Sequence, residues 1–242
     1  MELFKMNDDY EAHEKLVKEL NDDALRTEYA KPLDDYQPGI IPSILGWILV
    51  FAGNTVYGSK PSYAKFKAVE VIARIPYQSW ESVSYTLLTA FYSSESYAIQ
   101  LCKMAAFGRF AQDNETMHVV VISDIVRKHG KEGFFRHTLI PLLFSFFYYW
   151  VIYVLYFFSH RAALEVNYLF ESHAYSQYSR FLAENEELLK NTPVMSEFLA
   201  FYGREAMNEY ELFSSIRNDE LIHRNRSIRE ISAHKRVWDK RS

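Results

Sequence analysis

The feature that most restricts the fold is a long run without a charged side chain, Thr138–Ser159, which lies between Arg136 and Arg161. Its length suits a helix that crosses the hydrocarbon core of a bilayer. Aromatic side chains are spread along the whole run, however, and these also suit the headgroup boundary. A second uncharged stretch, 37–59, contains Pro42. The sequence therefore predicts membrane-associated segments at 37–59 and 138–159, with a fully buried core helix as the alternative for the second.

The remainder of the chain predicts helices. Glycine (8) and proline (7) are scarce in 242 residues, so tight turns between many short strands are not expected. Amphipathic patterns predict helices over 63–110, 111–129, 162–190 and 196–230. Pro76 is expected to break or kink the first of these, and Pro193 separates the last two. We therefore expect an all-α fold.

Charge and cysteine content exclude several classes of function. A net charge of −4 argues against a nucleic-acid partner, which needs a basic surface. The single cysteine, Cys102, excludes a disulfide scaffold, a four-cysteine zinc site and a thiolate-bound iron–sulfur cluster. The acid-rich residues 1–23 are typical neither of a secretory signal nor of a transit peptide. Any metal must therefore be bound by carboxylates and imidazoles.

The pattern Glu-x-x-His occurs twice, as Glu115–His118 and as Glu220–His223. On a helix this spacing brings both side chains to one face, about 5–6 Å apart at Cβ, so that they can bind the same ion. One such pair alone carries little information in a chain with 8 histidines, and a solvated helix face explains it equally well.

A complete di-iron set carries more information than either pair. A four-helix di-iron site needs Glu-x-x-His on each of two helices and a single Glu on each of the other two. Glu70 and Glu171 are single acids in apolar parts of two further predicted helices. Four carboxylates would balance the charge of two iron(II) ions. We therefore expect a ferritin-like four-helix di-iron bundle with additional apolar interfacial membrane helices, and two iron ions bound by Glu70, Glu115, His118, Glu171, Glu220 and His223.

Four segments of the chain resemble the motifs of one family, in the same order. Residues 69–76 (VEVIARIP), 114–118 (NETMH), 170–174 (FESHA) and 217–225 (RNDELIHRN) resemble the family motifs LET…VP, NERMH, LEEEA and RADEAHHRD. The family is that of the alternative oxidases, the di-iron carboxylate ubiquinol or plastoquinol terminal oxidases. The resemblance covers about 63–224.

The resemblance implies roles for residues beside the ligands. Tyr178, seven residues after Glu171, corresponds to the family's redox-active tyrosine and is the expected catalytic residue. Asn114 and Asp219 correspond to residues that orient the ligands. Arg217, one turn before the last Glu-x-x-His pair, is expected to join them by pairing with Asp219 or its neighbours.

The same resemblance implies a quinol pocket that includes Lys65, His173 and Ala174. Lys65 stands where the family has arginine, and a lysine lacks the planar fork of a guanidinium. Ser172 and His173 stand where the family has two glutamates. These departures lie beside the reducing substrate, not among the expected metal ligands.

As a function, the resemblance implies a membrane-bound, non-proton-pumping quinol:oxygen oxidoreductase that reduces O₂ to water. Its partners would be ubiquinol or another quinol, O₂, the lipid of one membrane leaflet and a second copy in a homodimer. The departures keep open a di-iron oxygenase that hydroxylates a quinone precursor or a lipid. A non-catalytic membrane-associated helical protein and an iron-storage bundle are alternatives from other classes.

The order of the ligands along the chain restricts the topology. Expected ligands precede and follow 138–159, so a single span there would place them on opposite sides of the bilayer. We therefore expect a monotopic protein. Its expected location is a bacterial inner membrane or the inner membrane of a mitochondrion-related organelle. The expected organisation is a polar arm (1–36), an apolar segment (37–59), the di-iron bundle (60–230, including 138–159) and a basic tail (231–242).

Overall fold

The structure, a computed structural model, describes residues 6–129 and 133–238. Within these ranges the regular elements are helices, and the one β-type pairing is an isolated bridge between Pro193 and Asn208. The all-α expectation is confirmed. The helices form two compact units: Tyr63–Ser159 with the start of the chain as far as His13, and Glu14–Ser62 with the chain from His160 onward.

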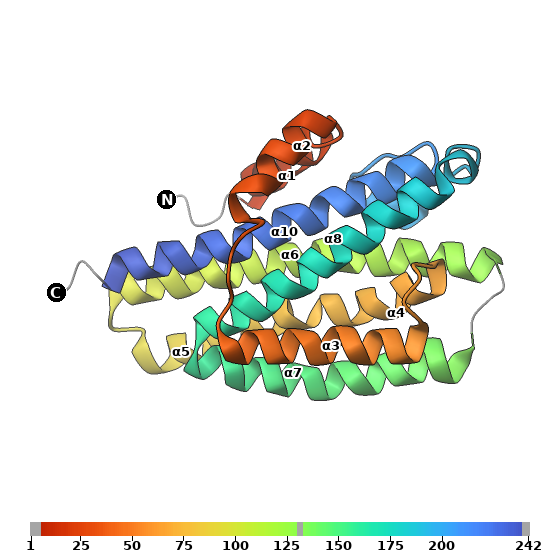
Figure 1. Cartoon of the computed structure of the whole chain (residues 1–242). Coiled ribbons are helices and arrows are strands. Elements are labelled where there is room, and N and C mark those ends of the chain that lie inside the picture. Colours follow the sequence, from red (N-terminus) through yellow and green to blue (C-terminus); the bar gives the residue numbers. More distant parts are fainter. Residues whose placement is uncertain (1–5, 130–132, 239–242) are drawn as a thin grey trace. The chain divides into compact units, whose positions relative to one another are not determined.

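The first unit contains four main helices, labelled in Figure 1. They are α4 (Tyr63–Ala73), α5 (Ile75–Phe91), α6 (Glu95–His129) and α7 (Ile140–Phe158), with a short π-helical turn, η2 (Phe135–Leu139), before α7. Helices α4 and α5 each pack against both α6 and α7. The buried rings of Tyr77, Trp80 and Phe107 form an edge-on and tilted aromatic cluster at the centre of this packing.

A glycine lets α5 and α6 approach closely. A Cβ atom at Gly108 would lie 2.8 Å from the carbonyl oxygen of Tyr77 and 3.4 Å from the backbone nitrogen of Glu81. Both are backbone atoms of the neighbouring helix, which cannot move aside without shifting the whole element. The contact between α5 and α6 therefore depends on a residue without a side chain at this position.

The breaks between these helices agree only in part with the sequence prediction. The expected break near Pro76 is confirmed, because α5 begins at Ile75 with this proline in its first turn. The boundary predicted between 110 and 111 is wrong, since α6 continues through it. The actual break follows Phe91, where two serines precede α6, and serine favours helix ends because its hydroxyl competes for backbone hydrogen bonds.

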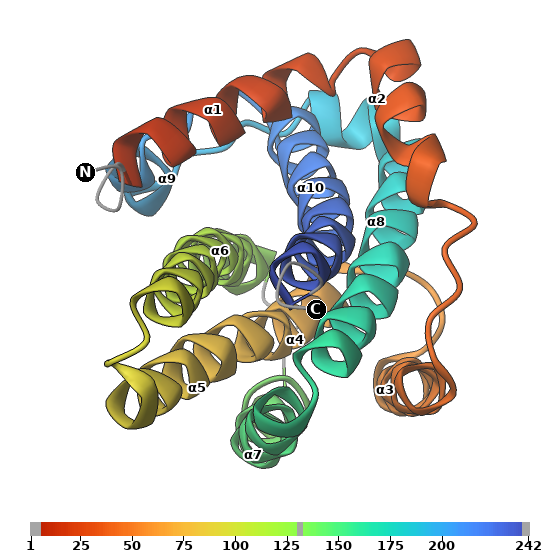
Figure 2. The same cartoon turned by 90° about the vertical axis from the view of Figure 1, so that its left-hand side faces the viewer.

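The second unit is built around two long helices that pack along each other, α8 (His160–Lys190) and α10 (Glu209–Trp238). Both Figure 1 and Figure 2 show them side by side. The unit also contains the end of α1 (Met6–Glu19), then α2 (Asp23–Ala30), the short η1 (Lys31–Leu33), α3 (Ile40–Tyr57) and α9 (Glu197–Tyr202).

The single helix predicted over 196–230 is wrong. Helix α9 ends at Gly203, whose φ of 92° lies in the left-handed region that favours glycine. The chain then runs without helix to Glu209, where α10 begins.

The predicted terminal segments are largely helical where the structure describes them. The polar arm contains α1, α2 and η1, and the basic tail contains the end of α10 as far as Trp238. Residues 1–5 of the arm, 130–132 of the predicted bundle and 239–242 of the tail lie outside the described residues.

A buried carboxylate joins α8 to the chain that precedes α3. Glu165 of α8 accepts hydrogen bonds from the Tyr36 hydroxyl (2.7 Å), the Gly39 backbone nitrogen (2.9 Å) and Arg161 Nε (2.9 Å). Burial alone would raise the pKa of Glu165, but these donors lower it below its ordinary value of 4.5. The start of α3 is thereby fixed against α8.

The two apolar segments form α3 and α7, which are long and apolar enough to cross a membrane by length and composition. Helix α7 buries one face on α4 and α5, so it is not the fully buried core helix of the alternative. Each helix also presents an exposed apolar face. On α7 this face consists of Leu142, Leu143, Phe146, Phe147, Trp150, Val151, Val154, Phe157 and Phe158, and on α3 of Ile40, Ile41, Ile44, Trp47, Ile48 and Phe51.

Candidate metal centre

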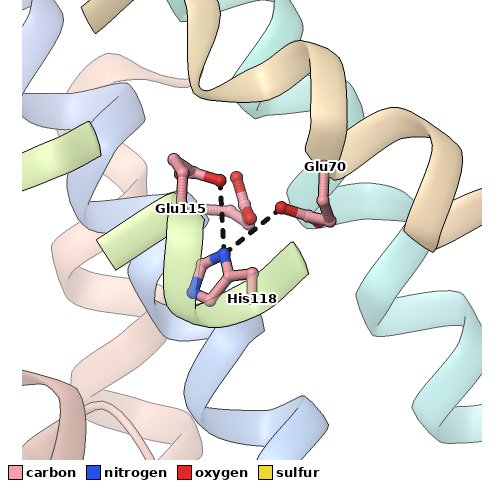
Figure 3. Close-up of side chains that lie close together, drawn as sticks. Glu70, Glu115 and His118 are labelled. Atoms are coloured by element: carbon pink, nitrogen blue, oxygen red, sulfur yellow. Dashed lines mark hydrogen bonds and ion pairs between the residues drawn. The ribbon is translucent and has the colours of Figure 1, made fainter. Parts of the chain in front are cut away.

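Three of the expected ligands lie together in the first unit. Glu70 extends from α4, and Glu115 and His118 extend from α6 (Figure 3). The Nδ1 atom of His118 lies 3.3 Å from one carboxylate oxygen of Glu70 and 3.3 Å from one of Glu115. We call these three residues the first ligand cluster. Each of their side chains is at most 1% exposed.

The electrostatics of this cluster are those of buried carboxylates held close together. Burial raises the pKa of Glu70 to about 7, the hydrogen bond with His118 opposes this rise, and the nearby charge of Glu115 adds to it. A bound cation would instead favour the ionised form of these carboxylates over the protonated form.

The other three expected ligands lie together in the second unit. Glu171 belongs to α8, and Glu220 and His223 belong to α10. One ligand atom of each lies within 4.8 Å of the corresponding atoms of the other two. We call these residues the second ligand cluster, and they too are at most 1% exposed. The packing of α8 against α10 brings together residues that are about 50 positions apart in the chain.

Two polar residues that were not predicted from the sequence, Asn167 and Ser227, form hydrogen bonds with residues of the second ligand cluster. Asn167 Nδ2 donates to Glu171 Oε1 (3.1 Å) and to the Ser227 hydroxyl (3.2 Å). That hydroxyl in turn donates to the carbonyl oxygen of His223 (3.0 Å). Each lies one turn from a ligand on a buried face, and this is the sequence signal that could have identified them.

The donor set fits iron. Each cluster offers two carboxylates and one imidazole, all buried, and the clusters together contain no sulfur donor. Buried carboxylates are costly unless a cation balances them. Oxygen and imidazole ligands in this ratio are those of the di-iron carboxylate proteins.

Asp219, directly before the expected ligand Glu220, is paired with Arg204. Arg204 Nη2 donates to Asp219 Oδ1 (3.0 Å), and the same guanidinium donates to Glu14 through Nε (3.1 Å). Burial alone would lower the pKa of Arg204, but these two carboxylates raise it above its ordinary value. Arg217 donates instead to the side chain of Asn218 (3.0 and 3.2 Å), so it contacts a neighbour of Asp219.

Tyr178 lies two turns after Glu171 on α8 and is 1% exposed. Its ring stacks against that of Phe213, with ring centroids 6.1 Å apart. The ring of Phe181 packs edge-on against that of Phe213. Tyr178 is therefore buried against an aromatic ring of α10, in the helix pair that carries the second ligand cluster.

The residues expected around a quinol lie in both units. Lys65 is buried on α4 in the first unit, where Asn114, which is expected to orient the ligands and not the quinol, is also buried, on α6 next to Glu115. On α8, Ala174 is buried and His173 is half-buried. The Ser172 hydroxyl donates to the carbonyl oxygen of Tyr168 (2.6 Å), so in this structure it bonds to its own helix.

Comparisons with known proteins agree with these observations. Residues 57–230, a range that contains both ligand clusters, match the family model described as alternative oxidase. A curated relative, ubiquinol oxidase 4, chloroplastic/chromoplastic, from Arabidopsis thaliana, is 27% identical over 191 residues, which cover 70% of this chain and 51% of the relative. The chain thus spans about half the length of the curated relative that it matches.

Proposed function

Because the chain belongs to the alternative oxidase family, we propose that it is a membrane-bound quinol:oxygen oxidoreductase that reduces O₂ to water without pumping protons. The observation that carries this proposal is the burial of two carboxylates and one imidazole in each of its two units. A helical protein with a purely structural role has no need of four buried carboxylates, each of which lowers its stability.

We propose that the six residues of the two ligand clusters bind two iron ions. When bound, the iron supplies the redox chemistry that accepts electrons and reduces O₂. The protein holds the ligands in place beforehand: the Asn167 amide fixes one oxygen of Glu171, and Ser227 ties His223 to the same amide. Burial of the clusters keeps bulk water from the reacting centre.

Tyr178 is the proposed redox-active residue. A phenol can donate one electron and its proton, and Tyr178 is buried from bulk water with its ring against that of Phe213. Its position on the same helix as Glu171, two turns away, supports this role.

Lys65, His173 and Ala174 are the proposed quinol-pocket residues. Lys65 lies five residues before Glu70 on α4, and Ala174 lies three residues after Glu171 on α8. These short spacings on regular helices place each residue within two turns of a proposed ligand. A lysine would offer a single point charge to the headgroup where the family presents a guanidinium.

The contacts of α7 support an interfacial position in the membrane. The Ser145 hydroxyl donates to the carbonyl of Val71 (3.3 Å), and the Ser79 hydroxyl donates to the carbonyl of Tyr149 (3.1 Å). Helix α7 therefore follows α4 and α5 along its length. If α7 crossed the bilayer, the charged side chains of those helices would enter with it, at about 2.5–3.5 kcal/mol each at the bilayer centre. We propose that the exposed faces of α7 and α3 lie in the same leaflet.

The localisation in a bacterial or organellar inner membrane and the homodimer stay predictions from the family resemblance. The topology has a direct test. Single cysteines at Lys128 and Lys190, in a chain with Cys102→Ser, should react with a membrane-impermeant reagent from one and the same side of the membrane. Labelling from opposite sides would contradict the monotopic arrangement.

Oxygen consumption tests the activity. The purified full chain, supplied with ubiquinol or menaquinol analogues, should consume O₂ in the presence of cyanide. Glu220→Ala should abolish this consumption because it removes a proposed ligand. Glu186→Ala, which removes an exposed carboxylate that pairs with Lys190 on α8, should retain it. An inactive wild-type chain that carries its full complement of iron would contradict the proposed function.

A further inference from the structure

The start of the second unit covers the outer side of the helical turn that carries two proposed ligands. We call Glu14–Asp34 the N-terminal segment and residues 218–225 of α10 the ligand turn. Glu220 and His223 belong to the second ligand cluster. The other residues of the ligand turn contact the N-terminal segment, directly or through one arginine.

Polar bonds connect the segment to the turn just before Glu220. Asn218 Nδ2 donates to the carbonyl of Val17 (2.9 Å) and to the side chain of Asn21 (2.9 Å). The next residue, Asp219, is bound by Arg204, whose guanidinium also binds Glu14. This arginine and both of its carboxylate partners are largely or fully buried.

A second set of bonds follows His223. Arg224 donates through Nη1 to Asp34 (2.8 Å) and through Nη2 to the carbonyl of Ala30 (2.8 Å). Asn225 Nδ2 donates to the carbonyl of Tyr29 (2.8 Å). Two buried guanidinium groups thus bracket the ligand pair, and each bridges α10 to the N-terminal segment.

Apolar packing fills the space between these two sets of bonds. The residues between the two ligands, Leu221 and Ile222, form one buried cluster with Val17, Leu20 and Ala30 of the segment. Along α10, residues that belong to the second ligand cluster alternate with residues that contact the N-terminal segment. Displacement of the segment would therefore leave the outward side of the ligand turn without support.

We propose that the N-terminal segment is a clamp that positions Glu220 and His223 for the metal, with Arg204 and Arg224 as positioning residues. The inference rests on the proposed function only in taking these two side chains as iron ligands. A planar fork of N–H donors suits both sites, because each arginine bonds two partners through different nitrogens, a spacing that the single nitrogen of a lysine cannot reproduce. Linkage then requires that iron binding also strengthens the docking of the segment, by the same factor.

Iron retention by the full chain tests the clamp. Arg204→Lys and Arg224→Lys keep the positive charge but lose the spaced pair of hydrogen bonds that each guanidinium makes. Iron(II) should therefore pass to a chelator about 10-fold faster or more. The matched control is Tyr36→Phe, which removes a hydrogen bond to Glu165 of α8 and no hydrogen bond between the N-terminal segment and the ligand turn. The control should release iron at the wild-type rate.

Amide hydrogen exchange on the wild-type chain gives a second readout, which does not depend on how well a variant folds. Adding iron(II) without oxygen should slow exchange in the N-terminal segment and in the ligand turn by similar factors. Protection of α10 alone would overturn the clamp while leaving the metal site intact. Equal iron release from the two lysine variants and the control would overturn it too. A wild-type chain that binds no iron would overturn both the clamp and the proposed function.

Discussion

Gly108→Ala should destabilise the protein, although alanine is the better helix former. The glycine lies inside α6, where replacement by alanine would by itself stabilise the helix by about 1 kcal/mol. The new Cβ, however, would lie 2.8 Å from the carbonyl oxygen of Tyr77 in α5. Because that atom belongs to the backbone of a packed helix, α5 and α6 must separate to accommodate the methyl group.

The size of the effect follows from the two opposing contributions. Overpacking of this kind costs about 1–3 kcal/mol, and the close backbone contact favours the upper part of that range. After subtraction of the helix-propensity gain, we expect a net loss of about 1–2 kcal/mol. Gly53→Ala is the matched control, since Gly53 also lies inside a helix and a Cβ there has no neighbouring atom within 4 Å. This second variant should gain up to about 1 kcal/mol.

Denaturant unfolding of both variants in the same detergent measures the difference. The free energies of unfolding should differ by about 1–3 kcal/mol, with Gly108→Ala the less stable. Since α6 also carries Glu115 and His118 of the first ligand cluster, Gly108→Ala should reduce iron retention as well. Equal stability of the two variants would refute the close approach of α5 and α6.

Four further predictions concern the site and its surroundings. Glu115→Ala should lose most of the bound iron and all turnover, which metal analysis and O₂ uptake would show. Tyr178→Phe should keep its iron and fold but lose most of its rate; near-normal turnover would assign the residue to packing alone. Lys65→Ala should raise the KM for quinol at unchanged iron content, and kinetics identical to wild type would place the pocket elsewhere. Glu165→Gln should lower stability at neutral pH. The lowered pKa of Glu165 stabilises the native state fully above pH 4.5 and progressively less below it, so the deficit of the variant should shrink as the pH falls below 4.5.

Local patterns predicted much of the fold. Helical periodicity and the shortage of glycine and proline indicated an all-α chain, and Pro76 marked the break that precedes α5. The break at Gly203 was missed because the periodic pattern continues on both sides of it, and a single glycine inside such a pattern is often tolerated. The continuity of α6 was missed for the reverse reason, since no local signal distinguishes one long helix from two.

The proximity of each Glu to its His could be predicted because three-residue spacing on a helix is a local property. Their supporting contacts could not be. Arg204 reaches Glu14 across 190 positions of the chain, and Asn167 reaches Ser227 across 60. No periodicity in the sequence encodes such pairings, because they depend on which helices pack together. Sequence proximity predicted that Arg217 would pair with Asp219 or its neighbours, and it bonds to the neighbour Asn218, whereas the pairing of Asp219 with the distant Arg204 could not be predicted.

The ratio of quinol oxidised to O₂ consumed distinguishes an oxidase from an oxygenase. Quinol donates two electrons and the reduction of O₂ to water takes four, so the iron-loaded full chain should oxidise two quinol molecules for each O₂, with water and quinone as the only products. The departures at Lys65, Ser172 and His173 keep the oxygenase alternative relevant to this measurement. One reductant per O₂, together with a hydroxylated quinone precursor or lipid, would contradict the proposed oxidase activity and identify the protein as an oxygenase.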